Sequence, residues 1–277
     1  MALSKDEGTA AGRGRNLDRR DSVRSGGAVL YRSVFDTGMD GWIDHWNGYG
    51  PALVISRTSE MCYRGSHSLM LSTGEHPSPP ADDVSSFVAA FKRLNRHDAY
   101  RYHSVSAYLA VGVGNYNGAW DSFYLYIDTQ RQDNANRSFY QVRCSRYINP
   151  NHLTWMIRGD TGATPEQKMV AVPGSAHSFI GNNENKLNFQ YVRLTVDLQA
   201  NSGAGGYKEL QVGNQVFDLS GLGAGSSVEP IQGNTGLDID DFAGGFNIGF
   251  GLYRNISTPD GCQLLVDDVV LTASNTY

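Results

Sequence analysis

The stretch that decides the fold is Tyr191-Val-Arg-Leu-Thr-Val-Asp-Leu198. Apolar and polar side chains alternate through all eight residues, and a period of two is typical of a strand with one buried face. The same alternation recurs in residues 105–111, 122–128 and 246–253. These four segments predict half-buried antiparallel strands.

Weaker versions of the pattern predict seven more strands, and turn signals such as Asn117-Gly118 and Asp260-Gly261 separate many of them. No amphipathic helix of twelve or more residues is visible. A succession of strands without helices indicates an all-β protein, and we expect a jelly-roll-like antiparallel β-sandwich. The seven additional segments are residues 52–57, 67–72, 86–93, 139–145, 153–158, 207–212 and 264–272.

The chain divides into an arm and a body. Residues 1–27 are polar and aperiodic, with six basic and four acidic side chains, and we expect a flexible N-terminal arm there. Residues 28–277 show no break in composition, so they are expected to form one domain. The arm is either a solubilising tail or a segment that docks on an acidic neighbour.

Composition and charge exclude several classes of protein. A net charge of −5 disfavours a broad nucleic-acid surface, and no apolar run approaches the 18 residues of a membrane span. The three cysteines form no C-x-x-C motif and suit a reducing compartment. The first twenty residues lack the apolar region of a signal peptide. The expectation is a protein made in the cytoplasm, which stays there or enters a virion.

Three segments carry a resemblance to a known family. They are Val34-Phe-Asp-Thr-Gly-Met-Asp-Gly-Trp42, Tyr63-Arg-Gly-Ser-His-Ser-Leu-Met-Leu71 and Leu264-Leu-Val-Asp-Asp-Val-Val-Leu271. Together they resemble the ends of a carbohydrate-binding-module jelly roll of the galactose-binding-like type. The resemblance implies that the closing strand pairs beside the opening strand.

The same resemblance implies a structural calcium ion, held by Asp36, the carbonyl of Gly65 and Asp267. Calcium takes six to eight hard oxygen ligands, which carboxylates and carbonyls supply. Asp267 and Asp268 have opposite strand parity, so we expect one of them to face inward, where a buried carboxylate needs a partner. The alternative is an aspartate that caps backbone N–H groups at a sheet edge.

Aromatic and polar residues suggest a sugar-binding face. Tyr108, Tyr124 and Tyr126 point outward from two predicted strands, and Trp120 lies in the predicted loop between them. If these strands pair as a hairpin, the aromatic rings share one face beside Arg143 or Arg158. Trp46 belongs to a second aromatic cluster, in the loop of residues 41–50. The alternative is that the tyrosine face is itself buried.

No catalytic constellation is visible. The chain lacks an E-x-D-x-E strand, G-x-S-x-G, H-E-x-x-H and a P-loop, and we assign no catalytic residue. The first hypothesis is a non-catalytic module that binds a glycan. The alternatives are a structural or virion component, such as a phage decoration or tail protein, that acts through protein contacts as a homo-oligomer, and a carbohydrate-active lyase or hydrolase.

Overall fold

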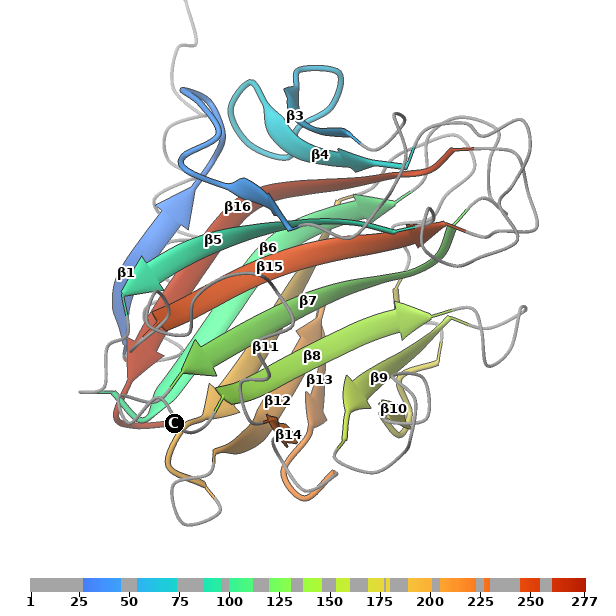
Figure 1. The fold of residues 1–277 in the computed structure, drawn as a ribbon. Helices are drawn as coiled ribbons and strands as arrows, with labels where there is room; N and C mark the ends of the chain where they lie inside the picture. The colour runs from blue at the N-terminus through green and yellow to red at the C-terminus, as the bar shows by residue number, and fades with distance from the viewer. Residues whose placement is uncertain are drawn as a thin grey trace, which may run out of the picture.

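A computed structural model gives the fold of most of the predicted body (Figure 1). It describes residues 27–45, 54–73, 87–95, 100–111, 120–130, 137–145, 153–159, 169–176, 178–179, 189–200, 205–222, 227–229, 245–254 and 261–277. Within these ranges the chain forms sixteen strands in two antiparallel sheets. The predicted all-β sandwich is therefore confirmed.

The first sheet has the strand order β13-β12-β11-β6-β16-β4-β3, and β1 pairs with β16. Strands β6 and β16 lie near its centre and are buried at nearly every residue. Its members are β1 (Ala28–Ser33), β3 (Val54–Thr58), β4 (Ser68–Ser72), β6 (Tyr102–Val111), β11 (Gln190–Asp197), β12 (Gly206–Val212), β13 (Gln215–Asp218) and β16 (Gln263–Ser274).

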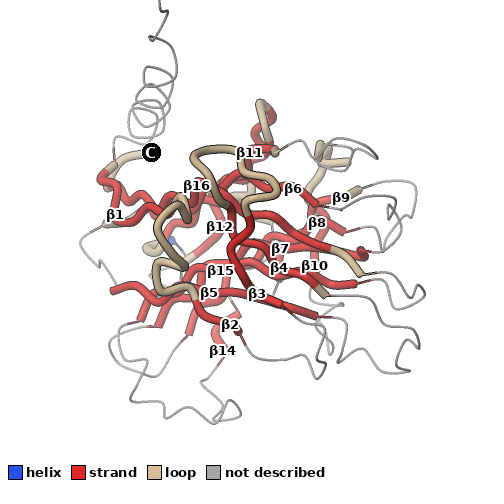
Figure 2. Tube along the Cα trace, turned by 90° about the horizontal axis from the view of Figure 1, so that it is seen from above, coloured by secondary structure: helices blue, strands red, loops and turns tan. Residues whose placement is uncertain are grey.

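The second sheet has the order β10-β9-β8-β7-β15-β5-β2, and β14 pairs with β8. Figures 1 and 2 show the two sheets as stacked layers. The members of the second sheet are β2 (Ile43–His45), β5 (Phe87–Asn95), β7 (Trp120–Gln130), β8 (Arg137–Ser145), β9 (Thr154–Arg158), β10 (Met169–Ala171), β14 (Ser227–Glu229) and β15 (Gly245–Arg254).

All eleven predicted strands are present, with small changes at their ends. Sequence reasoning missed β1, β2, β10, β13 and β14, most of them too short to show a period. The segment 34–42, which resembles an opening strand, lies between β1 and β2 instead. The opening strand is β1, and it pairs with the closing strand β16 as the resemblance implies.

The core fills the space between the sheets. Apolar side chains from both inner faces form one cluster, with Trp155, Tyr140, Phe35 and Phe123 among the largest members. Among the residues that the structure describes, no helix has the length and apolar character needed to cross a membrane. Two outer faces remain, one on each sheet, and the predicted binding residues are distributed between them.

Candidate functional site

The outer face of the second sheet carries a cluster of aromatic side chains outside the main core. Parity separates it from the core: Phe123, Leu125 and Ile127 point inward from β7, while the tyrosines between them point outward. Strands β5, β7, β8 and β15 each contribute a ring, so the cluster spans the middle of the sheet. Its aromatic members are Phe87, Phe91, Tyr124 and Tyr126, with Phe139 and Tyr253 packed against them.

Two glycines on β15 let the tyrosine rings lie down on the sheet. Gly251 is opposite Tyr124 and Gly249 is opposite Tyr126 in the pairing of β15 with β7. A Cβ atom built on either glycine would lie 2.2 Å from the Cζ atom of the facing tyrosine ring. The rings thus occupy the space that side chains on β15 would take, which leaves Tyr124 only 5% and Tyr126 only 3% exposed.

Three arginines lie over rings of this cluster. The guanidinium carbon of Arg143 is 4.7 Å from the centroid of Tyr253, that of Arg158 is 5.0 Å from Phe139, and that of Arg93 is 5.7 Å from Phe91. The three guanidinium groups come from β8, β9 and β5. We call this surface, the three arginines with the aromatic cluster beneath them, the arginine face.

Its exposure is uneven. Arg93 is exposed, and Arg143, Arg158, Phe139 and Tyr253 are half-buried. A ligand on this face would therefore meet guanidinium groups and the rings under them first. Tyr124 and Tyr126 form the floor, so the alternative reading of a buried tyrosine face holds for these two rings.

Polar neighbours complete the arginine face. Arg143 donates a hydrogen bond from Nε to Oγ of Ser122 at 2.8 Å, which fixes the side chain beside the aromatic floor. The carboxylate of Asp128 is buried next to the Asn247 amide, 3.5 Å away. The charged groups among the side chains described on this face are thus the three guanidinium groups and the buried carboxylate of Asp128. A cation over an aromatic ring is attracted by the ring's electron-rich face.

Burial raises the pKa of the Tyr124 hydroxyl well above its usual value, and the nearby Tyr253 and Tyr126 hydroxyls raise it further, against a smaller opposing effect of Arg143. At neutral pH this phenol is a hydrogen-bond donor and not a base. The floor of the face is thus neutral and apolar, and its charge comes from the arginines.

The sugar-binding residues predicted from the sequence do not all meet. Strands β6 and β7 lie in different sheets, so they form no hairpin, and Tyr108 is separated from Tyr124 and Tyr126 by the core. The structure does bring Tyr124, Tyr126 and Arg143 together, with Arg158 nearby. Trp120 is the first residue of β7 and not part of a loop. Trp46 and the side chain of Trp120 lie outside the described residues.

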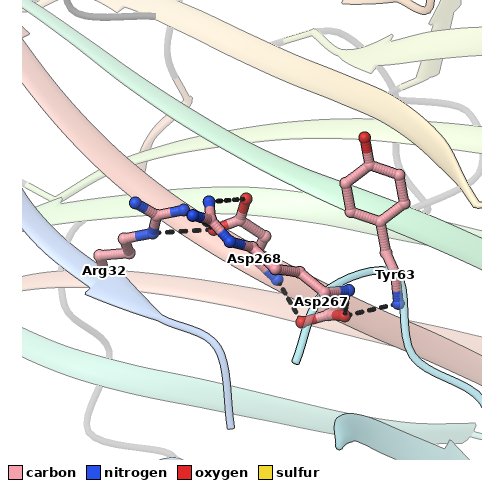
Figure 3. Close-up of polar contacts among 5 residues, drawn as sticks. Arg32, Tyr63, Asp267 and Asp268 are labelled. Carbon is pink, nitrogen blue, oxygen red and sulfur yellow. Dashed lines mark hydrogen bonds and ion pairs between the residues drawn. The ribbon is translucent and has the colours of Figure 1, made fainter. Parts of the chain in front are cut away.

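The other predicted site lies where β1, the segment 61–67 and β16 meet, and all three expected ligands are there. Oδ2 of Asp267 accepts backbone N–H bonds from Tyr63 and Arg64, each at 2.7 Å, and Oδ1 accepts one from Asp268 at 2.6 Å (Figure 3). Asp267 is fully buried. Its burial and the nearby negative charge of Asp268 raise its pKa to about 6, against the lowering effect of these three hydrogen bonds.

A bulge in β16 places both aspartates on the outer face. Asp267 pairs with Tyr108 and Val270 with Ser106, so three steps on β16 match two on β6. Asp268 has a φ of 47°, in the left-handed region that aspartate tolerates better than most residues. The expectation that one aspartate faces the core is wrong, because the bulge resets the alternation. Asp268 binds Arg32 instead, at 2.7 Å, and Arg64 at 3.5 Å.

The segment 61–67 also binds Asp36, through Ser66. Its Oδ1 accepts bonds from the backbone N–H of Ser66 at 2.6 Å and from Oγ of Ser66 at 3.1 Å, and the backbone bond lowers the pKa of Asp36. A Cβ atom on Gly65 would lie 2.2 Å from the Asp36 carboxylate, and Gly65 has a φ of 73°. Only glycine fits both conditions.

This arrangement does not fit a calcium ion. Three N–H groups point at the oxygens of Asp267 and two donors of Ser66 point at Asp36, where a cation would require lone pairs free of donors. The carbonyl of Gly65 accepts a bond from the Cys62 thiol at 3.3 Å. The described residues also contain no group of three or more His, Cys, Asp or Glu side chains that could hold a metal ion. The calcium site stays a prediction, and this geometry counts against it.

Sequence reasoning missed several members of these sites. Arg93 and Tyr253 reach the arginine face through the pairing of β5 and β15, which one sequence does not reveal. One signal was available: the glycines of Gly249-Phe-Gly251 alternate with the buried residues of β15. Glycines at every second position of a strand indicate a close neighbour on that face.

Comparisons with known proteins agree on the fold. No protein-family model matches the sequence, and a search of curated proteins finds no match. Among solved structures, the chain is similar to an endo-β-1,4-glucuronan lyase from the fungus Trichoderma reesei, with 10% identity and a TM-score of 0.54 over 89% of this chain and 96% of that one. It is also similar to the carbohydrate recognition domain of Emp47p, with 11% identity and a TM-score of 0.50 over 90% and 97%.

A third similar structure is the CBM22-1 xylan-binding domain of Paenibacillus barcinonensis Xyn10C, with 12% identity and a TM-score of 0.34 over 91% and 97% of the two chains. At such low identity, the first two likenesses show that this chain shares a sandwich fold with those proteins. The resemblance noted in the sequence is confirmed at this level of fold.

Proposed function

We propose that this protein binds a glycan that carries carboxylate groups, and that the arginine face is the binding surface. The observation that carries the proposal is the set of three guanidinium groups, each over an aromatic ring, on one face of the second sheet. Rings supply apolar surface for sugar rings, and guanidinium groups bind carboxylates with two parallel hydrogen bonds.

The similar structures support the proposal. One of them is a lyase that acts on glucuronan and another is a carbohydrate recognition domain, according to their names. Both have the same sandwich architecture at low identity, so they support glycan binding as a use of this fold and leave the ligand to the residues of this chain.

A lyase is the alternative that the first of these structures suggests. A tyrosine that removes a proton from a sugar needs a pKa near the working pH. The pKa of Tyr124 is shifted in the opposite direction, which favours a structural and binding role for that hydroxyl. A virion component acting through protein contacts has no observation of its own in its favour.

The test compares binding of an oligoglucuronate with binding of the same oligosaccharide after chemical reduction of its carboxyl groups, by isothermal titration calorimetry. We expect the reduced sugar to bind at least about tenfold more weakly, since the loss of each hydrogen bond to a charged group weakens binding by about 1.5–3 kcal/mol. The variants Arg143→Ala and Arg158→Ala should show a comparable loss. Lys208→Ala removes one positive charge from the other sheet and should bind as the wild type does.

Several results would contradict the proposal. They are equal binding of the native and reduced sugars, unchanged binding by both arginine variants, and equal loss in Lys208→Ala. Incubation of the same samples with the polymer, followed by a size assay of the products, tests the lyase alternative, since a binding module leaves the chain length unchanged.

A further inference from the structure

The three arginines of the arginine face lie at two ends of it. Arg143 and Arg158 come from the neighbouring strands β8 and β9, and Arg93 comes from β5, on the far side of β7 and β15. Arg143 is opposite Met156, and Arg158 is two residues further along β9, so the Cα atoms of the two arginines are diagonal neighbours about 7–8 Å apart. One end of the face therefore has two guanidinium groups and the other end has one.

One row of paired residues connects the two ends. Phe139, the ring beneath Arg158, is opposite Asp128 in the pairing of β8 with β7. Asp128 is opposite Asn247 on β15, and Asn247 is opposite Arg93 on β5. Figure 1 shows these four strands side by side. The row makes three steps between neighbouring strands, so Phe139 and Arg93 are about 14 Å apart at about 4.8 Å a step, and the continuous ladder fixes this separation.

The middle of this row, as far as the structure describes it, has no cationic residue. Asp128 and Asn247 are both buried, and Nδ2 of Asn247 lies 3.5 Å from Oδ2 of Asp128. A carboxylate on a ligand therefore finds a guanidinium group at either end of the row and a buried carboxylate between the ends. Such a distribution of charge determines where on a surface the charged groups of a ligand bind.

Each end of the row is accessible and ordered before a ligand binds. Arg93 is exposed and Arg158 is half-buried. The guanidinium group of Arg158 lies over Phe139 and that of Arg93 over Phe91, and a side chain restricted in this way loses less conformational entropy on binding. A single uronic acid residue has one carboxylate, so it can contact one end of the row and not both.

We infer that the arginine face selects its ligand by length as well as by charge, and that it binds a linear polyuronate laid across the strands. One carboxylate of the chain binds at the end formed by Arg143 and Arg158, another binds Arg93, and uncharged parts of the intervening sugars lie over Asp128 and Asn247. The inference rests on the proposed function and names the class of glycan that the same face takes.

The two ends contribute unequally to binding. A short oligouronate occupies the end with two guanidinium groups, because that end attracts it more strongly. A chain that also reaches Arg93 gains a second contact at a fixed distance. The second contact is then intramolecular, so it raises the affinity well above that of either end alone.

The experiment is isothermal titration calorimetry of the full chain with oligoglucuronates of increasing length, from the disaccharide to the polymer. The affinity of the wild type should rise sharply at the length that first reaches both ends. Arg158→Ala should weaken the binding of every ligand. Arg93→Ala should bind the disaccharide as the wild type does and should bind the long chains about tenfold more weakly, on the order of one hydrogen bond to a charged group.

Two variants serve as controls. Arg93→Lys keeps the positive charge without the planar guanidinium group, so it should recover part of the affinity for long chains that Arg93→Ala loses. Lys208→Ala removes a positive charge from the first sheet and should bind ligands of every length as the wild type does. The melting temperature of each variant verifies that it is folded, and the exposed position of Arg93 makes its replacement compatible with the fold.

The dependence on length separates this inference from the proposed function. If Arg93→Ala weakens the binding of the disaccharide and of the long chains by the same factor, or of neither, the two ends do not act together. The inference is then overturned, while binding that still requires the carboxylates and Arg143 leaves the proposed function standing. An affinity of the wild type that stops rising at the disaccharide has the same meaning. If no oligoglucuronate binds, both are overturned.

Discussion

The contact between Gly251 and the Tyr124 ring predicts that Gly251→Ala changes the free energy of unfolding with a sign that depends on whether this ring is present. The variant Gly251→Ala places a methyl group 2.2 Å from the ring's Cζ atom, so the buried ring must move. Overpacking of this kind destabilises a fold by about 1–3 kcal/mol. Alanine also restricts the unfolded chain, which offsets about 0.5–1 kcal/mol. The net expectation is a loss of about 1–2 kcal/mol in the free energy of unfolding.

Removing the Tyr124 ring should reverse the sign of this change in the free energy of unfolding. In a Tyr124→Ala background no ring lies over residue 251, so only the gain from the less flexible unfolded chain remains, and Gly251→Ala should stabilise by about 0.5 kcal/mol. Denaturant unfolding followed by tryptophan fluorescence measures all four corners of this cycle. Gly38→Ala is the control, because a Cβ there meets nothing closer than 3.9 Å. If Gly251→Ala has the same effect with and without Tyr124, the tyrosine does not occupy the space above the glycine, and the description of the floor is wrong.

Three further predictions concern the cluster around Asp36, Gly65 and Asp267 and the ion pair of Arg101 with Asp197. Gly65→Ala should destabilise by about 1–3 kcal/mol more than Gly174→Ala in denaturant unfolding, because both have a φ near 72° but only Gly65 faces a carboxylate, and equal losses would refute the steric argument. Addition of EDTA or of millimolar calcium should leave the melting temperature unchanged, since N–H donors face the oxygens of Asp267 and Asp36; a calcium-dependent rise would show that a metal is bound. Burial raises the pKa of Asp197, but the hydrogen bonds and charge of Arg101 and two backbone N–H groups lower it below its usual value. The pair therefore stabilises the fold above about pH 4, and this stabilisation disappears as the pH falls through the lowered pKa. Arg101→Gln should be less stable than wild type at pH 7 and equal to it in acid, and a pH-independent difference in unfolding free energy would contradict this.

The alternation of side chains predicted the strands because it reports a local property. A residue such as Leu194 or Phe250 points inward whichever strand lies beside it, so a period of two is visible in one sequence. Pairing is not local. Residues 105–111 and 122–128 are close in the chain and look like a hairpin, yet β6 pairs with β11 and β16 while β7 pairs with β8 and β15. Crossing from one sheet to the other between β6 and β7 split the predicted tyrosine face into two.

The bulge at Asp267 and Asp268 shows a second limit of pattern reasoning. Strict parity assigns one of the two acids to the core, and burying a charge there is costly. The chain avoids this by inserting one residue with a positive φ, so both carboxylates reach donors on the outer face. The resemblance brought Asp36, Gly65 and Asp267 together, but it did not reveal that backbone N–H groups bind Asp267 and that Ser66 binds Asp36. These bonds depend on the path of residues 63–66, which no short motif encodes.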